Sequence, residues 1–339
     1  MHKEDDLKLS GISEVARKAG VSIATVSRVL NNSSSVRMET RIKILQIIKE
    51  LKYHPSRVAK RLRNKKASGN LLGVLIPDIQ NPFYVEVLRG IEDVAYENKY
   101  ALIMCNFSQD EKKEKLYLDI LQSESIDGLI AAPVHEHDQK VINLVKEGLP
   151  IVCFDRGLSG VDVDVVLVEN KNGAFSAVDH LAKSGYKKIA YISGLPQLPS
   201  SQQRESGYTD ALIANNLPID KSLIKYSDSR HESGLRLCDE LLNLSSPPDA
   251  IFTGNNLITL GALEAIHKRG LKIPEEVAII GFDDMYWSIS LNPPLTAVRQ
   301  PAYEIGKRAA EQLILRINDP TRPTASMILK TELMIRNSC

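Results

Sequence analysis

Two short segments of helical pattern, separated by one glycine near the N-terminus, constrain the fold of this chain more than any other feature. Residues 12–19 and 23–31 place alanine and valine at helical spacing, so two crossing helices can touch. Gly20 stands between them, where a residue without Cβ tolerates a positive φ. Ser22 can cap the second helix. These features predict a helix-turn-helix, whose second helix is of a size that the DNA major groove admits.

A third helix and a basic segment follow. The pattern predicts a helix over residues 38–52, where Ile44, Ile48 and Leu51 recur at i, i+4 and i+7 and close a three-helix core. Residues 56–63 are basic and too few to hold a helix alone. Residues 64–70 have the composition of a linker.

The charge of the chain is unevenly distributed. Residues 1–66 hold 16 Lys and Arg against 6 Asp and Glu, a net charge of +10, whereas the remainder carries −9. A basic head on an acidic body favours a head that meets phosphate and a body that does not. Together with the helical pattern, the charge favours DNA binding over a solvated surface hairpin.

From residue 71 onward, short apolar runs alternate with segments of helical length. Such runs are typical of parallel strands buried on both faces, and the alternation predicts βαβ units. About eleven strands are too many for one small sheet, so we expect two α/β lobes. The predicted strands are residues 71–76, 102–105, 128–132, 151–154, 165–168, 189–193, 224–226, 250–253, 277–282, 297–299 and 327–330.

Several classes of protein find little support in the sequence. The four cysteines are widely separated and show no metal-ligand spacing, and we expect them to be reduced thiols in the cytoplasm. We expect no membrane span, no secretory signal, no cofactor and no metal; the His135–Asp138 cluster is interpreted as loop residues. No phosphate-binding glycine motif or nucleophile elbow appears, so we predict that the chain is not an enzyme.

The head and body together resemble the lactose-repressor/purine-repressor family over essentially the whole chain. The strings that carry the resemblance are Ala19-Gly-Val-Ser22, Thr25-Val-Ser-Arg-Val-Leu-Asn31, Pro55-Ser-Arg-Val-Ala-Lys-Arg-Leu62, Pro77-Asp-Ile-Gln-Asn-Pro-Phe-Tyr84, Asp127-Gly128, Ile280-Gly-Phe-Asp283 and Pro294-Leu-Thr-Ala-Val-Arg-Gln-Pro301. The resemblance implies an all-α helix-turn-helix head and a periplasmic-binding-protein-like α/β core of two doubly wound parallel-sheet lobes. It further implies a homodimer on double-stranded, near-palindromic operator DNA.

The domain boundaries follow from the resemblance and the pattern together. We expect a DNA-binding domain at 1–55, a hinge helix and linker at 56–70, and an effector-binding and dimerisation core at 71–339. Lobe one comprises about 71–168 plus about 299–325. Lobe two comprises about 169–298 plus the C-terminal strand. The family often begins its third helix with Ser or Thr, whereas this chain has Arg37, so Ser35 or an uncapped start must serve.

The resemblance also implies which residues contact DNA. Arg28 can give paired hydrogen bonds to guanine, and Ile23 favours a thymine methyl group. Leu62 matches the family's leucine that enters the minor groove and kinks the duplex. The residues implied to contact DNA are Ser22, Ile23, Ala24, Thr25, Ser27, Arg28, Asn31, Ser56, Ala59, Lys60 and Leu62.

Polar residues at strand ends predict an effector site between the lobes, since open α/β sheets bind ligands there. Acids, amides and arginines suit adjacent sugar hydroxyls, and aromatic faces suit sugar C–H groups, with Trp287 as a further aromatic candidate. Two acids with two arginines favour a neutral monosaccharide, and the set resembles that of ribose-type repressors. The predicted residues are Asn81, Phe83, Tyr84, Asp155, Arg156, Arg204, Asn255, Asp283 and Gln300.

The sequence therefore predicts a sugar-controlled regulator, most often a repressor, of carbohydrate genes. Two alternatives stay open. One is a catabolite-control regulator governed by a protein co-regulator; the other is a sugar-binding receptor without a role on DNA.

Overall fold

The computed structural model describes residues 11–30, 33, 35–51, 53 and 69–339, and the chain forms two compact units, Met1–Gly69 and Asn70–Cys339. Within the described residues, no helix has both the length and the apolar character needed to cross a bilayer.

The first unit is a three-helix core. It consists of α1 (Ile12–Ala19), α2 (Ile23–Leu30) and α3 (Met38–Glu50). Val15 on α1, Val26 on α2 and Ile44 on α3 are fully buried in one shared apolar core. This is the packing that the helical spacing predicts. Ile48 and Leu51, which we expected in this core, pack against it as partly buried side chains.

The turn between α1 and α2 depends on Gly20. Its φ is 69°, in the left-handed region, and its backbone N–H donates to the carbonyls of Ala16 and Arg17. A residue with a Cβ would be strained there although space is open around it, so the requirement is conformational rather than steric. Helix α3 begins at Met38, and its N-cap residue Arg37 makes no side-chain cap; the Ser35 hydroxyl bonds the Ser33 hydroxyl, so the start of the helix is uncapped.

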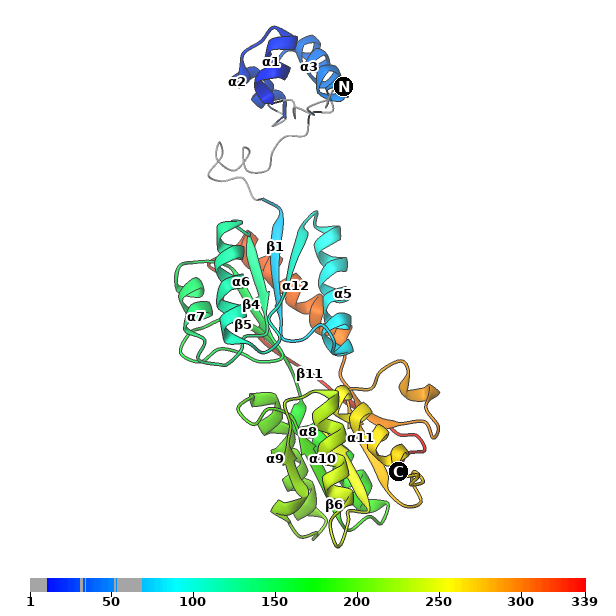
Figure 1. Ribbon diagram of the computed structural model, residues 1–339. Helices are drawn as coiled ribbons and strands as arrows, with labels where there is room; N and C mark the ends of the chain where they lie inside the picture. Colours follow the sequence, from blue (N-terminus) through cyan, green and yellow to red (C-terminus); the bar gives the residue numbers. More distant parts are fainter. Residues whose placement is uncertain (1–10, 31–32, 34, 52, 54–68) are drawn as a thin grey trace. The chain divides into compact units, whose positions relative to one another are not determined.

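Lobe one of the second unit is built on a six-stranded parallel sheet in the order β11-β5-β4-β3-β1-β2. Its strands are β1 (Leu71–Ile76), β2 (Ala101–Asn106), β3 (Gly128–Ala131), β4 (Ile151–Phe154), β5 (Asp164–Val168) and β11 (Ser326–Leu329). Its helices are α5 (Pro82–Glu97), α6 (Glu111–Ser123), α7 (Gln139–Lys146) and α12 (Ala302–Asn318). Helix α12 lies beside α5 although it comes from the far end of the chain (Figure 1).

Lobe two has a six-stranded sheet in the order β12-β10-β9-β8-β6-β7. Its strands are β6 (Ile189–Ser193), β7 (Ile224–Tyr226), β8 (Ala250–Thr253), β9 (Ala278–Phe282), β10 (Thr296–Arg299) and β12 (Glu332–Met334). Its helices are α8 (Asn170–Lys183), α9 (Pro199–Ala214), α10 (His231–Leu242) and α11 (Asn256–Lys268), with short 3-10 helices η1 (Lys221–Leu223) and η2 (Ser288–Ser290). The chain passes between the lobes after β5, after β10 and after β11.

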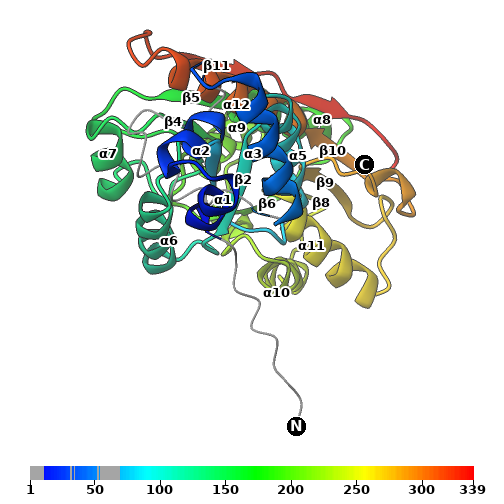
Figure 2. The ribbon, with the colours of Figure 1, turned by 90° about the horizontal axis from the view of Figure 1, so that it is seen from above.

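The structure differs from the expectation at the C-terminus. The strand expected at 327–330 is β11, which pairs with β5 and extends lobe one beyond residue 325 (Figure 2). A twelfth strand, β12, pairs antiparallel with β10 in lobe two and was not predicted. Only three residues long, β12 is too short for a period-2 pattern to separate from a loop. The predicted two-lobed parallel architecture is otherwise confirmed.

Helices α5 and α12 cross at two glycines. A Cβ on Gly306 would lie 1.8 Å from the Val87 carbonyl oxygen, and one on Gly90 would lie 2.1 Å from the Tyr303 carbonyl oxygen. Both obstacles are backbone atoms, which cannot move without separating the helices. The crossing therefore requires glycine at both positions.

We predict that Gly306→Ala lowers the free energy of unfolding by about 2–3 kcal/mol, because the added methyl forces α12 away from α5. Gly157→Ala is the matched control in the same lobe, since its Cβ would meet Val165 at an ordinary 3.5 Å. Urea unfolding followed by circular dichroism measures both variants. Equal midpoints for the two would contradict the role of the crossing.

Candidate functional site

The first candidate surface is the outer face of α2. Ser22, Ile23, Ala24 and Arg28 are exposed on it, and Thr25 and Ser27 are half-buried. The Ser22 hydroxyl accepts the Thr25 backbone N–H at 3.2 Å and bonds the Thr25 hydroxyl at 2.9 Å. The predicted cap of α2 is thus confirmed, and the start of the helix presents polar groups beside the apolar Ile23.

The remaining predicted DNA contacts, which are Asn31, Ser56, Ala59, Lys60 and Leu62, lie outside the described residues. Their roles stay predictions.

The second candidate is a cavity between the two lobes, with a volume of about 60 Å³. All nine residues predicted for the effector site line it. Lobe one supplies Asn81, Phe83, Tyr84, Asp155 and Arg156; lobe two supplies Arg204, Asn255 and Asp283, and Gln300 lies where the chain returns to lobe one. The inter-lobe cavity is where parallel strands of both sheets end, as the strand-end argument predicts.

The lobe-one wall of the cavity is a buried triad. Arg156, which is 1% exposed, donates from Nε and Nη2 to Asp155 Oδ2 at 3.2 and 3.0 Å. The Tyr84 hydroxyl donates to the same oxygen at 3.2 Å and accepts from Arg156 Nη2 at 3.3 Å. Burial, and then the neighbouring Asp155, raise the pKa of Tyr84, so the phenol stays protonated. Arg156 Nη1 is buried without a partner among the described residues.

The lobe-two wall centres on Arg204 and Asp283. Arg204 Nε donates to Asn170 Oδ1 at 2.8 Å, Nη1 donates to the Gly254 carbonyl at 2.5 Å, and the guanidinium lies 3.8 Å from the Phe282 ring centroid. These contacts fix the position of the Arg204 side chain in lobe two.

Asp283 is 3% exposed and has a φ of 76°, which is unusual for a residue with a Cβ. Its Oδ1 accepts from Gln300 Nε2 at 2.5 Å. Burial raises the pKa of Asp283, although Arg204 and the Gln300 hydrogen bond act in the opposite direction. Gln300 Oε1 is buried without a partner in the part of the chain that the structure describes. Two unpartnered polar atoms, one on each wall, therefore belong to cavity residues.

Two of the predicted ligand residues are already engaged in helix capping. Asn81 Oδ1 caps α5 through the Phe83 N–H at 2.9 Å, and it also accepts from Asn256 Nδ2 of lobe two at 2.9 Å. Asn255 caps α11 through the Ile258 N–H at 2.8 Å, and its Nδ2 donates to the Ser229 carbonyl. Asn81 keeps its amide N–H groups for a ligand, whereas both ends of the Asn255 amide are occupied.

Some cavity residues escaped the sequence prediction. They are Asp78, Ser108, Gln109, Gly194, Leu198, Ser200, Ser201, Asp228, Ser229, Arg230 and Gly254. Most follow a strand end, so the same argument, applied to every strand, could have found them. Trp287, the further aromatic candidate, does not line the cavity: it packs as a partly buried side chain against the core of lobe two.

Comparisons with known proteins follow the same division of the chain. Residues 11–56 match the model of bacterial regulatory proteins, lacI family, and residues 178–339 match a periplasmic binding protein-like domain. Catabolite control protein A of Priestia megaterium is 37% identical over 96% of this chain and 98% of its own length. The chain belongs to the lacI family of bacterial regulatory proteins, and the predicted class of DNA-binding transcriptional regulator is confirmed.

Solved structures agree. The lac repressor dimer bound to operator and the anti-inducer ONPF has a TM-score of 0.82 and 26% identity, covering 98% of this chain and 99% of its own. A LacI family regulator from Enterococcus faecium with bound ribose has a TM-score of 0.72 and 29% identity, covering 79% of this chain and 98% of its own.

A buried acid lies near the lobe-one wall. Glu114 on α6 is fully buried, and its Oε1 accepts the Val134 backbone N–H at 2.9 Å. Burial, aided by the neighbouring Asp138, raises the pKa of Glu114 to about 9. The folded protein therefore holds this proton at neutral pH, whereas the unfolded chain releases it near pH 4.5.

Because the folded state binds the extra proton, Glu114 makes the free energy of unfolding fall as pH rises from about 5 to about 9. We predict that Glu114→Gln, which cannot ionise, removes this part of the pH dependence. Between pH 5.5 and pH 8.5 the free energy of unfolding of the variant should rise by at least about 1 kcal/mol relative to that of the parent chain. Urea unfolding at both pH values measures it; parallel losses in parent and variant would contradict the raised pKa.

Proposed function

We propose that this protein is a repressor of carbohydrate genes that binds a near-palindromic operator as a homodimer and is controlled by a neutral monosaccharide in the inter-lobe cavity. The observation that carries the sugar is the cavity itself, where buried hydrogen-bonding groups of both lobes converge with two atoms left unpartnered. Unsatisfied buried groups are costly, and sugar hydroxyls can donate to one and accept from the other.

The charges of the cavity support a neutral ligand. Asp155 and Arg156 balance each other on the lobe-one wall. On the lobe-two wall the acid Asp283 is paired with the base Arg204, which lowers the pKa of Asp283 against the effect of burial. A phosphorylated sugar would need an excess of positive charge that these four groups do not supply. Phe83 and Tyr84, whose rings lie 5.0 Å apart in an edge-to-face pair, support binding of sugar C–H groups.

The cavity must enlarge when a sugar enters. Ligand sites commonly measure about 300–1,000 Å³, against the 60 Å³ found here. Outside the three crossovers, the hydrogen bond between Asn81 and Asn256 is the one that joins lobe one to lobe two among the described residues. A sugar that separates these amides would change the angle between the lobes, which is the movement that a regulator of this type needs.

On DNA, the outer face of α2 is the proposed reading surface, with Arg28 toward guanine and Ile23 toward a thymine methyl group. Residues 56–70 are the proposed hinge between the DNA-binding domain at 1–55 and the core at 71–339, with Leu62 in the minor groove. A protein that works on chromosomal DNA would be cytoplasmic.

The proposed dimer contact is an apolar groove of about 1140 Å³ on the core, lined by α5, α12 and the loop after β9. Tyr286 and Ile289 on this loop are 86% and 66% exposed, and Val85 of α5 adds apolar surface from lobe one. Large apolar side chains that gather on an exposed surface favour a contact with another protein. Because the groove takes residues from both lobes, a change in lobe angle would alter it.

The alternative is control by a protein partner. It is favoured by the 37% identity to a catabolite control protein. A receptor without a role on DNA is disfavoured by the lacI-type head at 11–56.

We predict that at least one member of a panel of D-ribose, D-glucose and D-galactose raises the thermal midpoint by several degrees, and that their phosphates do not. A ligand at 100 times its dissociation constant adds about 2.7 kcal/mol of stability. Asp283→Asn should reduce the shift by at least half, because it removes the buried charge that sugar hydroxyls bind. Asp239→Asn, in the half-buried pair with Arg269 of the same lobe, is the control.

No shift with any sugar, or an undiminished shift in Asp283→Asn, would contradict a sugar site in the cavity. In the first case, control by a protein partner becomes the favoured reading.

A further inference from the structure

Gln300 lies between the groove and the cavity. Gln300 lines both spaces. Two residues that are adjacent in the chain line different spaces: Asp283 lines the cavity, and Asp284 lines the groove. This arrangement brings cavity and groove within one residue of each other.

The two sides of the wall are held by matching polar pairs. Toward the cavity, Gln300 Nε2 donates to Asp283 Oδ1 at 2.5 Å. Toward the groove, Arg299 donates from Nε and Nη2 to Asp284 Oδ2 at 3.1 and 2.8 Å. Each pair therefore joins the end of β9 to the end of β10, and the two pairs use consecutive residues on both strands. We call these four residues the clamp.

The backbone couples the two sides of the clamp. The N–H groups of Asp283 and Asp284 both donate to the Val298 carbonyl, at 2.9 and 3.0 Å. With both amides fixed on one oxygen and Asp283 held at φ 76°, the shared peptide cannot turn on one side alone. A shift of the Asp283 side is thus passed to Asp284.

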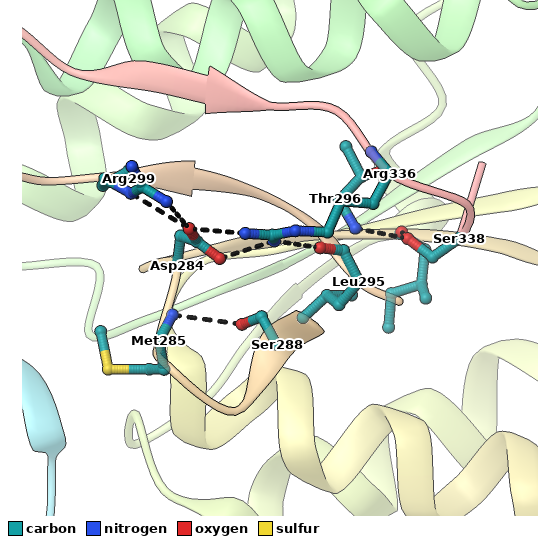
Figure 3. A network of polar contacts seen from close by, with 9 residues as sticks. Asp284, Met285, Ser288, Leu295, Thr296, Arg299, Arg336 and Ser338 are labelled. Carbon is teal, nitrogen blue, oxygen red and sulfur yellow. Dashed lines mark hydrogen bonds and ion pairs between the residues drawn. The ribbon is translucent and has the colours of Figure 1, made fainter. Parts of the chain in front are cut away.

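Asp284 in turn holds the loop that forms the groove. Its carboxylate is 3% exposed and accepts Arg336 Nη1 and Nη2 at 2.7 and 2.9 Å (Figure 3). Arg336 also donates to the Leu295 carbonyl, so it ties together both ends of the loop from Asp284 to Leu295. Tyr286 and Ile289, the most exposed apolar side chains of the groove, lie on this loop.

The charge state of Asp284 suits a fixed anchor. Burial alone would raise the pKa of Asp284, but Arg336 and Arg299 outweigh it and lower the pKa. Asp284 is therefore an anion at neutral pH, whereas burial raises the pKa of Asp283 on the other face. The contact that a ligand would replace is then the hydrogen bond between Gln300 and Asp283 on the cavity side, whereas the contacts of Asp284 stay in place.

We propose that the clamp transmits ligand binding in the cavity to the groove where a second copy of this chain docks, with Asp284 as its positioning residue. A sugar that engages Asp283 and Gln300 competes with their mutual hydrogen bond, the shared backbone moves Asp284, and the loop carrying Tyr286 and Ile289 moves with it. The inference rests on the proposed function, because the groove as dimer contact belongs to that proposal.

The test needs no sugar, so it succeeds or fails independently of the sugar screen. Gln300→Ala breaks the cavity side of the clamp in the full-length protein, and hydrogen–deuterium exchange reports on backbone amides 285–291. We expect exchange there to rise at least tenfold, while the amides of α10 change by less than twofold. Arg236→Gln, an exposed arginine paired with Glu240 on α10, is the control and should leave the loop unchanged. Unchanged loop exchange in Gln300→Ala overturns the proposal.

A second measurement separates transmission from local loosening. Sedimentation velocity gives the dimer dissociation constants of Gln300→Ala, Arg299→Gln and the double variant. Arg299 is half exposed and Asp284 keeps Arg336, so Arg299→Gln should fold. We expect each single change to raise the dimer dissociation constant at least fivefold. The dissociation constant of the double variant should exceed the larger of the two single-variant values by at most twofold. If the two effects multiply, the sides act independently and the clamp is overturned. A parent chain that forms no dimer would contradict the proposed dimer contact, and the exchange experiment would still decide on the clamp.

Discussion

Both the cavity and its connection to the groove depend on the three passages of the chain between the lobes. Parallel strands end at a common edge, and the passages after β5, β10 and β11 bring the strand-end loops of both sheets to one space. Because α12 and β11 belong to lobe one but follow β10 of lobe two, neither lobe is a continuous stretch of chain. The two lobes are therefore joined by chain segments that pass directly from the strands of one into the strands and helices of the other.

The polar groups of the cavity show how such a site can be both stable and responsive. Asp155, Arg156 and Tyr84 bond one another on the lobe-one wall, which offsets part of the cost of burying their charges, and Arg156 Nη1 is left without a partner among the described residues. Asp283 is held less completely, by Gln300 and a long contact of 3.4 Å from the Asn256 N–H. Each wall therefore keeps a buried polar atom that a ligand could satisfy, and Gln300 on the lobe-two wall also lines the groove.

Much of the fold and of the cavity could be predicted from the sequence because their signals are local. Gly20 between two apolar patterns gave the turn, and apolar runs followed by polar residues gave the strand ends that line the cavity. The signal failed where long-range geometry decides. Trp287 has the right residue type but packs against the core of lobe two, and β12 pairs with β10, a strand far from it in the sequence. The Asn81–Asn256 contact joins residues 175 positions apart, which no local pattern can indicate.

The central proposal is that occupancy of the inter-lobe cavity controls the affinity of the DNA-binding head for DNA. The most direct test measures binding to an operator selected from random duplex DNA by fluorescence anisotropy, with and without a saturating sugar from the panel. We predict that bound sugar changes operator affinity by about 5- to 150-fold, and that operator changes sugar affinity by the same factor, since such coupling is reciprocal. Arg28→Ala should weaken operator binding without altering the sugar affinity of the free protein. Operator affinity that is the same with and without bound sugar would contradict the account.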